Sequence, residues 1–195
     1  GKAVISYIEN PDNASYYLAS VSDKIFMTSY NGGMNMFTGL SSQMIFLKDI
    51  LDRLGVNVQL IRHGKYKSAG ELYIRNSSSK ENMEQNVAMV ESLWESLSTE
   101  IALSRDITVE ELNAMLNNLE LNFPTDFLEK GLVDELLSRE ELQQKLADLY
   151  VTDSYKKVNS ISLADYATIK DVPNLKASNK IAVIYAEGNI VDGSD

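Results

Sequence analysis

The spacing of apolar residues along the chain predicts alternating short strands and helices. Apolar runs at residues 3–8 and 25–28 are typical of short strands. Residues 16–19, which lie between these runs, predict one short helix. The chain is therefore expected to open with a strand, a helix and a second strand.

A longer helix and a third strand are predicted next. Apolar side chains over residues 40–54 recur at steps of three and four, which predicts an amphipathic helix. Gly55 stands where a left-handed helix end would fall, and residues 56–60 then alternate apolar and polar, as in a half-buried strand. A helix that leads into a strand through a single glycine indicates βαβ construction, and hence an α/β protein.

Several helices are predicted after this strand. Serine or threonine followed three residues later by glutamate is a capping signature, and it occurs at residues 78–81, 108–111 and 138–141. The first of these precedes an apolar stripe over residues 83–101, which predicts a long helix. Residues 127–134 predict a helix that is stopped by glycine and followed by a short apolar segment.

The pattern loosens after residue 149. Residues 150–179 contain proline and several serine, asparagine and lysine residues, which is typical of a connector. Residues 181–186 then predict a strong buried strand. We therefore expect a partial first unit at 1–149, a connector at 150–179, and the first strand and turn of a second unit at 180–195. Because no βα unit precedes the first strand, early elements of the fold are expected to be missing.

Composition excludes several classes of function. The chain has 18 basic and 28 acidic side chains and a net charge of −10, so nucleic acid is not expected as a partner. With no cysteine and one histidine, it lacks disulfides, a cysteine nucleophile and the usual zinc ligands, and no metal or other cofactor is expected. His63, the base that a common hydrolytic triad would need, is interpreted as a surface residue. The longest apolar run has six residues, far short of the ~20 that cross a membrane.

The loop at residues 62–70 places three cationic side chains together in an acidic protein. Lys67 is the candidate general base in this loop. A lysine amine acts as a base only when it is neutral, which requires burial or neighbouring cations to lower its pKa from about 10.4 toward 7 or 8. Arg62 and Lys65 lie close to Lys67 in the sequence. On spacing alone, a solvated surface lysine remains the simpler interpretation.

Residues 64–71 read GKYKSAGE and resemble a motif of a known family. They are similar to the G-x-Y-K-S-A segment in the amino-terminal half of the signal peptide peptidase A family, also called protease IV or peptidase family S49. The final residues, 181–193, are similar to the opening of that family's second repeat. Further similar stretches follow in the right order and cover nearly the whole chain: 16–20, 23–25, 47–56, 131–134 and 161–166.

The resemblance implies a ClpP/crotonase-like fold, a βαβ superhelix truncated at its start and with long helices after the lysine loop. It also implies a serine protease that degrades signal peptides already released from their precursors. Such a protease is expected at the bacterial inner membrane, facing the periplasm, as a homo-oligomer that is a tetramer in the parent protein. Its membrane association would use a segment absent from this chain.

The resemblance divides the catalytic residues between two repeats. In the long, tandem-repeat form the first repeat supplies a lysine base, which maps onto Lys67, and the second supplies the serine nucleophile. Ala14 aligns with that serine, and Ser15 is one position off and is followed by two tyrosines. This chain is therefore expected to lack the nucleophile and to be inactive alone. Tyr66 and Ser68 are candidate supporting residues, although Ser68 could equally cap the loop.

Two other interpretations stay open. A crotonase-like fold can also serve as a noncatalytic peptide-binding or oligomerisation module, for which Lys67 would be dispensable. An acyl-CoA hydratase or isomerase on the same fold would need backbone amides that hold a thioester oxyanion, and the sequence offers no matching loop.

Overall fold

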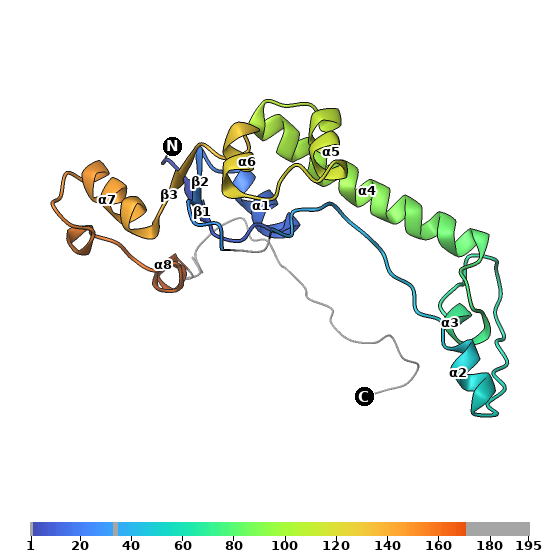
Figure 1. Ribbon diagram of the computed structural model, residues 1–195. Coiled ribbons are helices and arrows are strands. Elements are labelled where there is room, and N and C mark those ends of the chain that lie inside the picture. Colours follow the sequence, from blue (N-terminus) through green and yellow to red (C-terminus); the bar gives the residue numbers. More distant parts are fainter. Residues whose placement is uncertain (1, 33–34, 171–195) are drawn as a thin grey trace, which may run out of the picture.

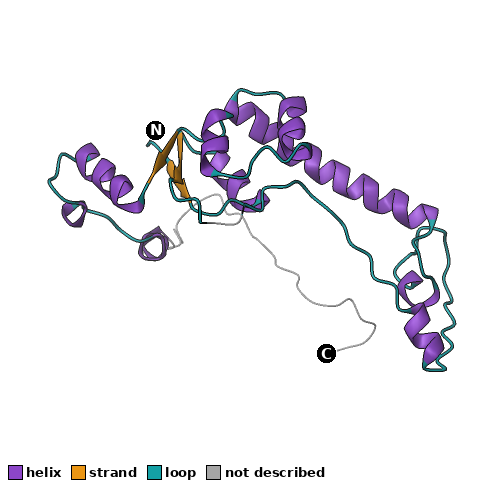
Figure 2. Ribbon diagram, viewed as in Figure 1, coloured by secondary structure: helices purple, strands orange, loops and turns teal. Residues whose placement is uncertain are grey.

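The computed structural model describes residues 2–32 and 35–170 of the chain, and shows a mixed α/β protein (Figures 1 and 2). The strands are β1 (Ile5–Ile8), β2 (Lys24–Thr28) and β3 (Glu135–Leu137). The helices are α1 (Asn13–Ser20), α2 (Lys48–Arg53), α3 (Glu71–Ile74), α4 (Lys80–Arg105), α5 (Val109–Asn117), α6 (Pro124–Glu129), α7 (Arg139–Leu149), the 3-10 helix η1 (Tyr155–Lys157) and α8 (Leu163–Lys170).

The strands form a parallel sheet in the order β1-β2-β3. β1 pairs with one side of β2, with Ile5 opposite Lys24, and β3 pairs with the other side of β2, with Glu135 opposite Phe26. The central strand β2 is buried over residues 25–28, as its unbroken apolar run predicts for a parallel strand covered on both faces. The predicted α/β class and the opening order of strand, helix and strand are confirmed, whereas the superhelix and its truncation stay predictions.

An aromatic cluster packs α1 against α6. The rings of Tyr16, Phe37 and Phe127 lie 4.6 to 6.4 Å apart between centroids, and all three side chains are buried. The Tyr16 hydroxyl donates a hydrogen bond of 2.6 Å to the carbonyl oxygen of Leu132. Because a buried hydroxyl needs a partner, this bond fixes the apolar segment that leads from α6 into β3.

Helix α4 runs away from the sheet and has α2 and α3 at its far end (Figure 1). It has 26 residues, which confirms the predicted long helix. Its N-cap is Ser79, whose hydroxyl accepts a hydrogen bond from the amide of Asn82, so the predicted capping box over residues 78–81 is wrong. Ile101 is buried near the sheet, whereas Met83 at the opposite end is 49% exposed.

The predicted helix over residues 40–54 is wrong over most of its length, because only α2, Lys48–Arg53, is helical. Residues 40–47 have no regular secondary structure and contact α4 instead. The Asn82 side chain donates to the sulfur of Met44 at 3.5 Å, for example. The predicted helix end is confirmed: Gly55 has φ +73°, and the next amide donates back into α2 at 2.9 Å.

The predicted strand over residues 56–60 is also wrong, because these residues have no regular secondary structure. They follow α2, which lies at the end of α4 far from the sheet (Figure 1). A strand forms only when a neighbouring strand accepts and donates its backbone hydrogen bonds. In the described part of the chain no other segment pairs with residues 56–60.

The predicted boundaries at residues 149 and 179 stay predictions. The described part of the proposed connector contains η1 and α8. The predicted strand at 181–186 lies outside the described residues.

The predicted capping boxes at the starts of α5 and α7 are confirmed. In α5, the Thr108 hydroxyl accepts a hydrogen bond from the amide of Glu111 at 3.1 Å, and the Glu111 carboxylate accepts one from the amide of Thr108 at 2.7 Å. These hydrogen bonds lower the pKa of Glu111. Each box therefore satisfies two amides that the helix itself leaves without a partner.

We expect Thr108→Ala to lower the free energy of unfolding by about 1 kcal/mol, because it removes the N-cap while exposing little new apolar surface. Urea unfolding of the 195-residue chain would measure the change. Ser96→Ala is a matched control, since Ser96 is an exposed hydroxyl in the middle of α4, and it should change stability by less than about 0.5 kcal/mol. Equal losses in both variants would contradict a capping role for Thr108.

Candidate active site

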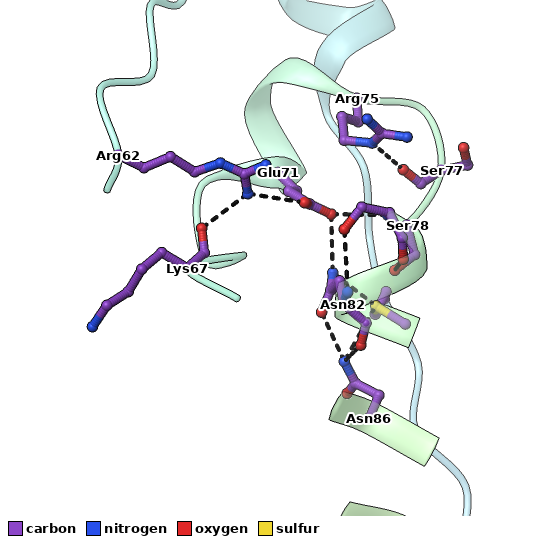
Figure 3. Close-up of polar contacts among 10 residues, drawn as sticks. Arg62, Lys67, Glu71, Arg75, Ser77, Ser78, Asn82 and Asn86 are labelled. Atoms are coloured by element: carbon purple, nitrogen blue, oxygen red, sulfur yellow. Dashed lines mark hydrogen bonds and ion pairs between the residues drawn. The ribbon is translucent and has the colours of Figure 1, made fainter. Parts of the chain in front are cut away.

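Lys67 lies in the tight turn that follows residues 56–62. Its amide donates to the carbonyl oxygen of Gly64 at 3.3 Å, and Gly64 has φ +94°, a conformation that favours glycine. Lys67 is exposed, and its amine points away from the polar cluster beside it (Figure 3). The turn therefore presents the amine to whatever binds at this surface.

An open groove of about 580 Å³ lies beside the lysine, and residues 60–63 and 66–70 form its walls. Apolar side chains contribute to the lining, among them Ile61, which is 97% exposed. Open apolar surface next to a few polar groups is typical of ligand sites. The groove could therefore hold part of a peptide close to the Lys67 amine.

The two predicted supporting residues have different contacts. The Tyr66 hydroxyl donates to the Glu84 carboxylate at 3.3 Å, and the Lys65 amine lies 4.9 Å from the centre of the Tyr66 ring. Ser68 is half-buried, and its carbonyl oxygen accepts a hydrogen bond of 2.9 Å from the amide of Glu71. Within the described part of the chain, neither hydroxyl is hydrogen-bonded to the Lys67 amine, so their supporting roles stay predictions.

Glu71 is a fully buried carboxylate next to this turn. One carboxylate oxygen accepts a hydrogen bond from the Arg62 guanidinium at 3.0 Å. The other accepts from the amide of Ser79 at 3.0 Å and from the side chain of Asn82 at 3.3 Å. Figure 3 shows this cluster, which joins the lysine turn to the start of α4.

The Glu71 carboxylate is ionised despite its burial. Burial by itself raises the pKa of a carboxyl group, because the charged form loses its hydration. Hydrogen bonds from Ser79, Arg62 and Asn82 outweigh that effect and lower the pKa of Glu71 from 4.5 to about 2. The N-terminus of α4 also favours a negative charge at this place. The cluster is therefore a fixed, charged anchor at neutral pH.

The structure does not bring Ser15 near Lys67. Ser15 is in α1, which lies beside the sheet, whereas Lys67 lies close to α3 at the far end of α4 (Figure 1). The Ser15 hydroxyl donates to the Asp12 carboxylate at 2.6 Å as part of a capping box, which lowers the pKa of Asp12. Ala14 is in the same first turn, and His63 is exposed. Ser15 thus has a structural role in the described residues.

Residues 2–32 and 35–170 contain neither a cluster of metal ligands nor a membrane-spanning helix. No group of three or more histidine, cysteine, aspartate or glutamate side chains is arranged to hold a metal ion. No helix in the same ranges combines the length and the apolar character that a membrane span needs.

Residues 1–152 match the family model described as Peptidase family S49. The chain belongs to peptidase family S49. It is 33% identical over 99% of its length to a protein named Protease 4 from Haemophilus influenzae, and 29% identical over its whole length to Protease 4 from Salmonella typhi. It is 24% identical over 97% of its length to the chloroplastic serine protease SPPA from Arabidopsis thaliana.

This S49 chain spans about a third of the length of the known relatives that it matches. It covers 32% of each of the two bacterial proteins and 28% of the plant protein. The family membership predicted from the GKYKSAGE motif is confirmed.

Sequence reasoning missed the polar cluster beside the lysine of this S49 chain. Glu71 is the last residue of the recognised motif, yet no role was predicted for it, and Arg62 was noted only as a nearby cation. The available signal was a single acidic residue directly after a cationic loop and shortly before a helix start. Burial of that acid would then have required a cationic partner, for which Arg62 was a candidate.

Proposed function

We propose that this S49 chain supplies the general base of a serine protease, and that Lys67 is the base. The observation that carries the proposal is the exposed Lys67 amine, which a tight turn presents at the edge of an open groove. Family membership and relatives named as proteases support the same activity. The serine nucleophile would come from polypeptide outside residues 1–195.

The proposed mechanism uses one proton carrier. The neutral Lys67 amine takes the proton of the serine hydroxyl as the serine oxygen attacks the carbonyl carbon of the peptide bond. The resulting ammonium then gives this proton to the nitrogen of the departing amine. Backbone amides beside the serine would stabilise the negative oxygen of the tetrahedral intermediate. This sequence of steps requires no histidine.

The same proposal requires that Lys67 be covered. A lysine that serves as a base must be neutral, which needs burial or neighbouring cations. The described residues leave Lys67 exposed. We infer that the polypeptide that carries the serine also covers the groove, so that substrate, serine and Lys67 meet in a site shielded from water.

We further propose a cellular context for the complete protein. Its substrates would be signal peptides already released from precursors, and it would act as a homo-oligomer at the bacterial inner membrane, facing the periplasm. These proposals rest on the family resemblance of the GKYKSAGE motif and of the stretches that accompany it. The membrane contact would use a segment outside residues 1–195.

A second candidate function is noncatalytic peptide binding. The exposed Ile61 side chain and the backbone of residues 57–60, which has no hydrogen-bond partner among the described residues, favour this alternative, because an extended peptide can add its backbone hydrogen bonds to such a segment. Binding of this kind would not depend on the Lys67 amine. Lys67 therefore separates the two candidates.

A fluorophosphonate probe tests where the nucleophile lies, because it reacts with activated serine hydroxyls. We expect the complete gene product to be labelled at a serine outside residues 1–195, and the isolated 195-residue chain to remain unlabelled. Mass spectrometry of tryptic peptides would locate the label, with Ser15→Ala and Ser68→Ala as matched controls. Stoichiometric labelling of the isolated chain at Ser15 or Ser68 would contradict the proposal.

A further inference from the structure

The buried carboxylate of Glu71 takes no part in the proton transfer proposed above, although it lies four residues from Lys67. We propose that Arg62 and Glu71 are positioning residues that fix the main chain of Lys67 relative to helix α4. The inference rests on the proposed function, because it assigns these two residues to the same site. Four hydrogen bonds join Arg62, Lys67, Glu71 and the start of α4. Three of them are buried or partly buried, and the bond from Arg62 to the carbonyl oxygen of Lys67 is exposed.

One nitrogen atom of the Arg62 side chain donates to two acceptors. Nη1 of Arg62 donates to the carbonyl oxygen of Lys67 at 3.0 Å and to the carboxylate of Glu71, also at 3.0 Å (Figure 3). A guanidinium nitrogen of this type carries two hydrogens, so it can make both bonds at once. The carbonyl of the proposed base is thereby tied to a buried charge through a single side chain.

Further hydrogen bonds connect that charge to a rigid element. The other carboxylate oxygen of Glu71 accepts from the amide of Ser79, the N-cap of α4, and from the Asn82 side chain in the first turn. The carbonyl oxygen of Asn82 in turn accepts from Asn86, one turn further along. The Lys67 main chain is therefore connected to a 26-residue helix by consecutive hydrogen bonds.

A close approach also joins the two segments that flank Lys67. Gly70 packs against the Leu60 side chain so tightly that a β-carbon on Gly70 would lie 2.5 Å from a methyl carbon of Leu60. The segment before Lys67 and the segment after it are thus in direct contact. Together with the Arg62 bond, this contact leaves the Lys67 main chain little freedom to move.

Main-chain position matters for the proposed chemistry. The Lys67 amine must reach the serine hydroxyl at hydrogen-bond distance, and misplacing a reacting group by about 1 Å can cost about a hundredfold in rate. The Lys67 side chain is itself long and flexible. A fixed starting point for that side chain reduces the number of conformations in which the amine misses the serine.

A merely structural role is the alternative, and the chain offers a matched comparison for it. Arg105 donates from two nitrogens to the carbonyl oxygen of Gly131 at 2.9 and 3.0 Å and lies 3.4 Å from the Asp134 carboxylate. Arg105 thus also links a carbonyl oxygen to a carboxylate, but it does so beside the sheet, where no catalytic residue is proposed. Its side chain is 12% exposed, compared with 33% for Arg62.

The test measures peptide cleavage by the complete gene product. We expect Arg62→Ala to lower kcat at least tenfold while KM changes less than about threefold, because the other residues that line the groove remain but the base is misplaced. Arg62→Lys should keep a cation near Glu71 but recover little of kcat, since the lysine side chain reaches its nitrogen one bond earlier than arginine reaches Nη1. Arg105→Ala should destabilise the protein and leave the kcat of the folded enzyme unchanged.

Hydrogen exchange of the 195-residue chain provides a measurement that does not depend on activity. With Arg62→Ala, we expect the amide of Lys67 to exchange at least tenfold faster, whereas amides in β2 keep their rates. Unchanged exchange at Lys67, or a kcat equal to that of the unchanged enzyme, would overturn the inference. If Lys67→Ala itself retained full activity, the proposed function would fail first, so the two failures are distinguishable.

Discussion

Replacing Lys67 by alanine in the complete gene product is expected to abolish peptide cleavage and to leave folding and assembly intact. General-base catalysis contributes roughly 10²- to 10⁴-fold to rate, and no neighbouring group replaces the amine in the proposed mechanism. Lys67 is exposed among the described residues, so its removal breaks no packing within this part of the chain. Steady-state cleavage of a fluorogenic peptide would measure the loss, and size-exclusion chromatography would report assembly.

Lys65→Ala is the matched control for this experiment. Lys65 is an exposed lysine of the same loop, it lies over the Tyr66 ring, and it does not contribute to the walls of the groove. We expect Lys65→Ala to retain activity within about twofold, because its cation–π contact at an exposed site contributes little. Turnover near wild type for Lys67→Ala would remove the base assignment and favour the peptide-binding alternative.

The local signals in the sequence were strong where neighbouring residues determine the structure. The capping boxes at Thr108 and Ser138 each need only a glutamate three residues later, and both form as predicted. Gly55 adopts the left-handed conformation expected at a helix end. The order of β1, α1 and β2 follows from apolar runs that are short, unbroken and separated by polar residues.

The failures occurred where a distant partner decides the structure. The apolar residues at 40–47 have helical spacing, which predicts a helix. In the structure these residues are irregular and contact α4 directly, for example through Met44. Alternation at 56–60 predicts a strand, yet a strand requires a neighbour, and the described sheet lies at the other end of α4. Periodicity indicates which face of a segment is apolar, but it does not identify the part of the chain that this face contacts.

The candidate site was likewise only half predictable. The family motif predicted Lys67 as the base, and this role stays a prediction, whereas the family itself is confirmed by the match to family S49. The anchor formed by Arg62 and Glu71 depends on a turn that brings together residues nine positions apart, and on the burial of one carboxylate. Neither distance nor burial follows from spacing in an irregular loop.

Glu71→Ala is expected to produce the largest change in local stability. Removing the carboxylate leaves the Arg62 guanidinium, the amide of Ser79 and the Asn82 side chain without their shared acceptor. Loss of one partner from a fully buried charged pair costs roughly 3 to 5 kcal/mol, and we expect a loss below that range because the Arg62 side chain is 33% exposed. Because the cluster is at the far end of α4, we expect the loss in the opening free energy of the lysine loop and α3, which hydrogen exchange measures residue by residue.

The same substitution at Glu84 is the matched control for this loss. Glu84 is exposed on α4 and accepts a hydrogen bond of 3.3 Å from the Tyr66 hydroxyl. Glu84→Ala should change the opening free energy by less than about 0.5 kcal/mol, as is usual for surface sites. Equal protection of the loop in the Glu71→Ala variant and the unchanged chain would contradict the anchoring role.

The anchor also predicts how the stability of the loop depends on pH. The pKa of Glu71 is about 2 in the folded chain, compared with an ordinary value of 4.5. Since the folded value is the lower one, the carboxylate stabilises the loop fully above about pH 4.5, and this stabilisation is lost as pH falls toward 2. Glu71→Gln has no titrating group at this position, so the pH dependence of its loop protection should be weaker over that interval. An equally steep dependence in Glu71→Gln would show that other carboxylates cause the acid sensitivity of the loop.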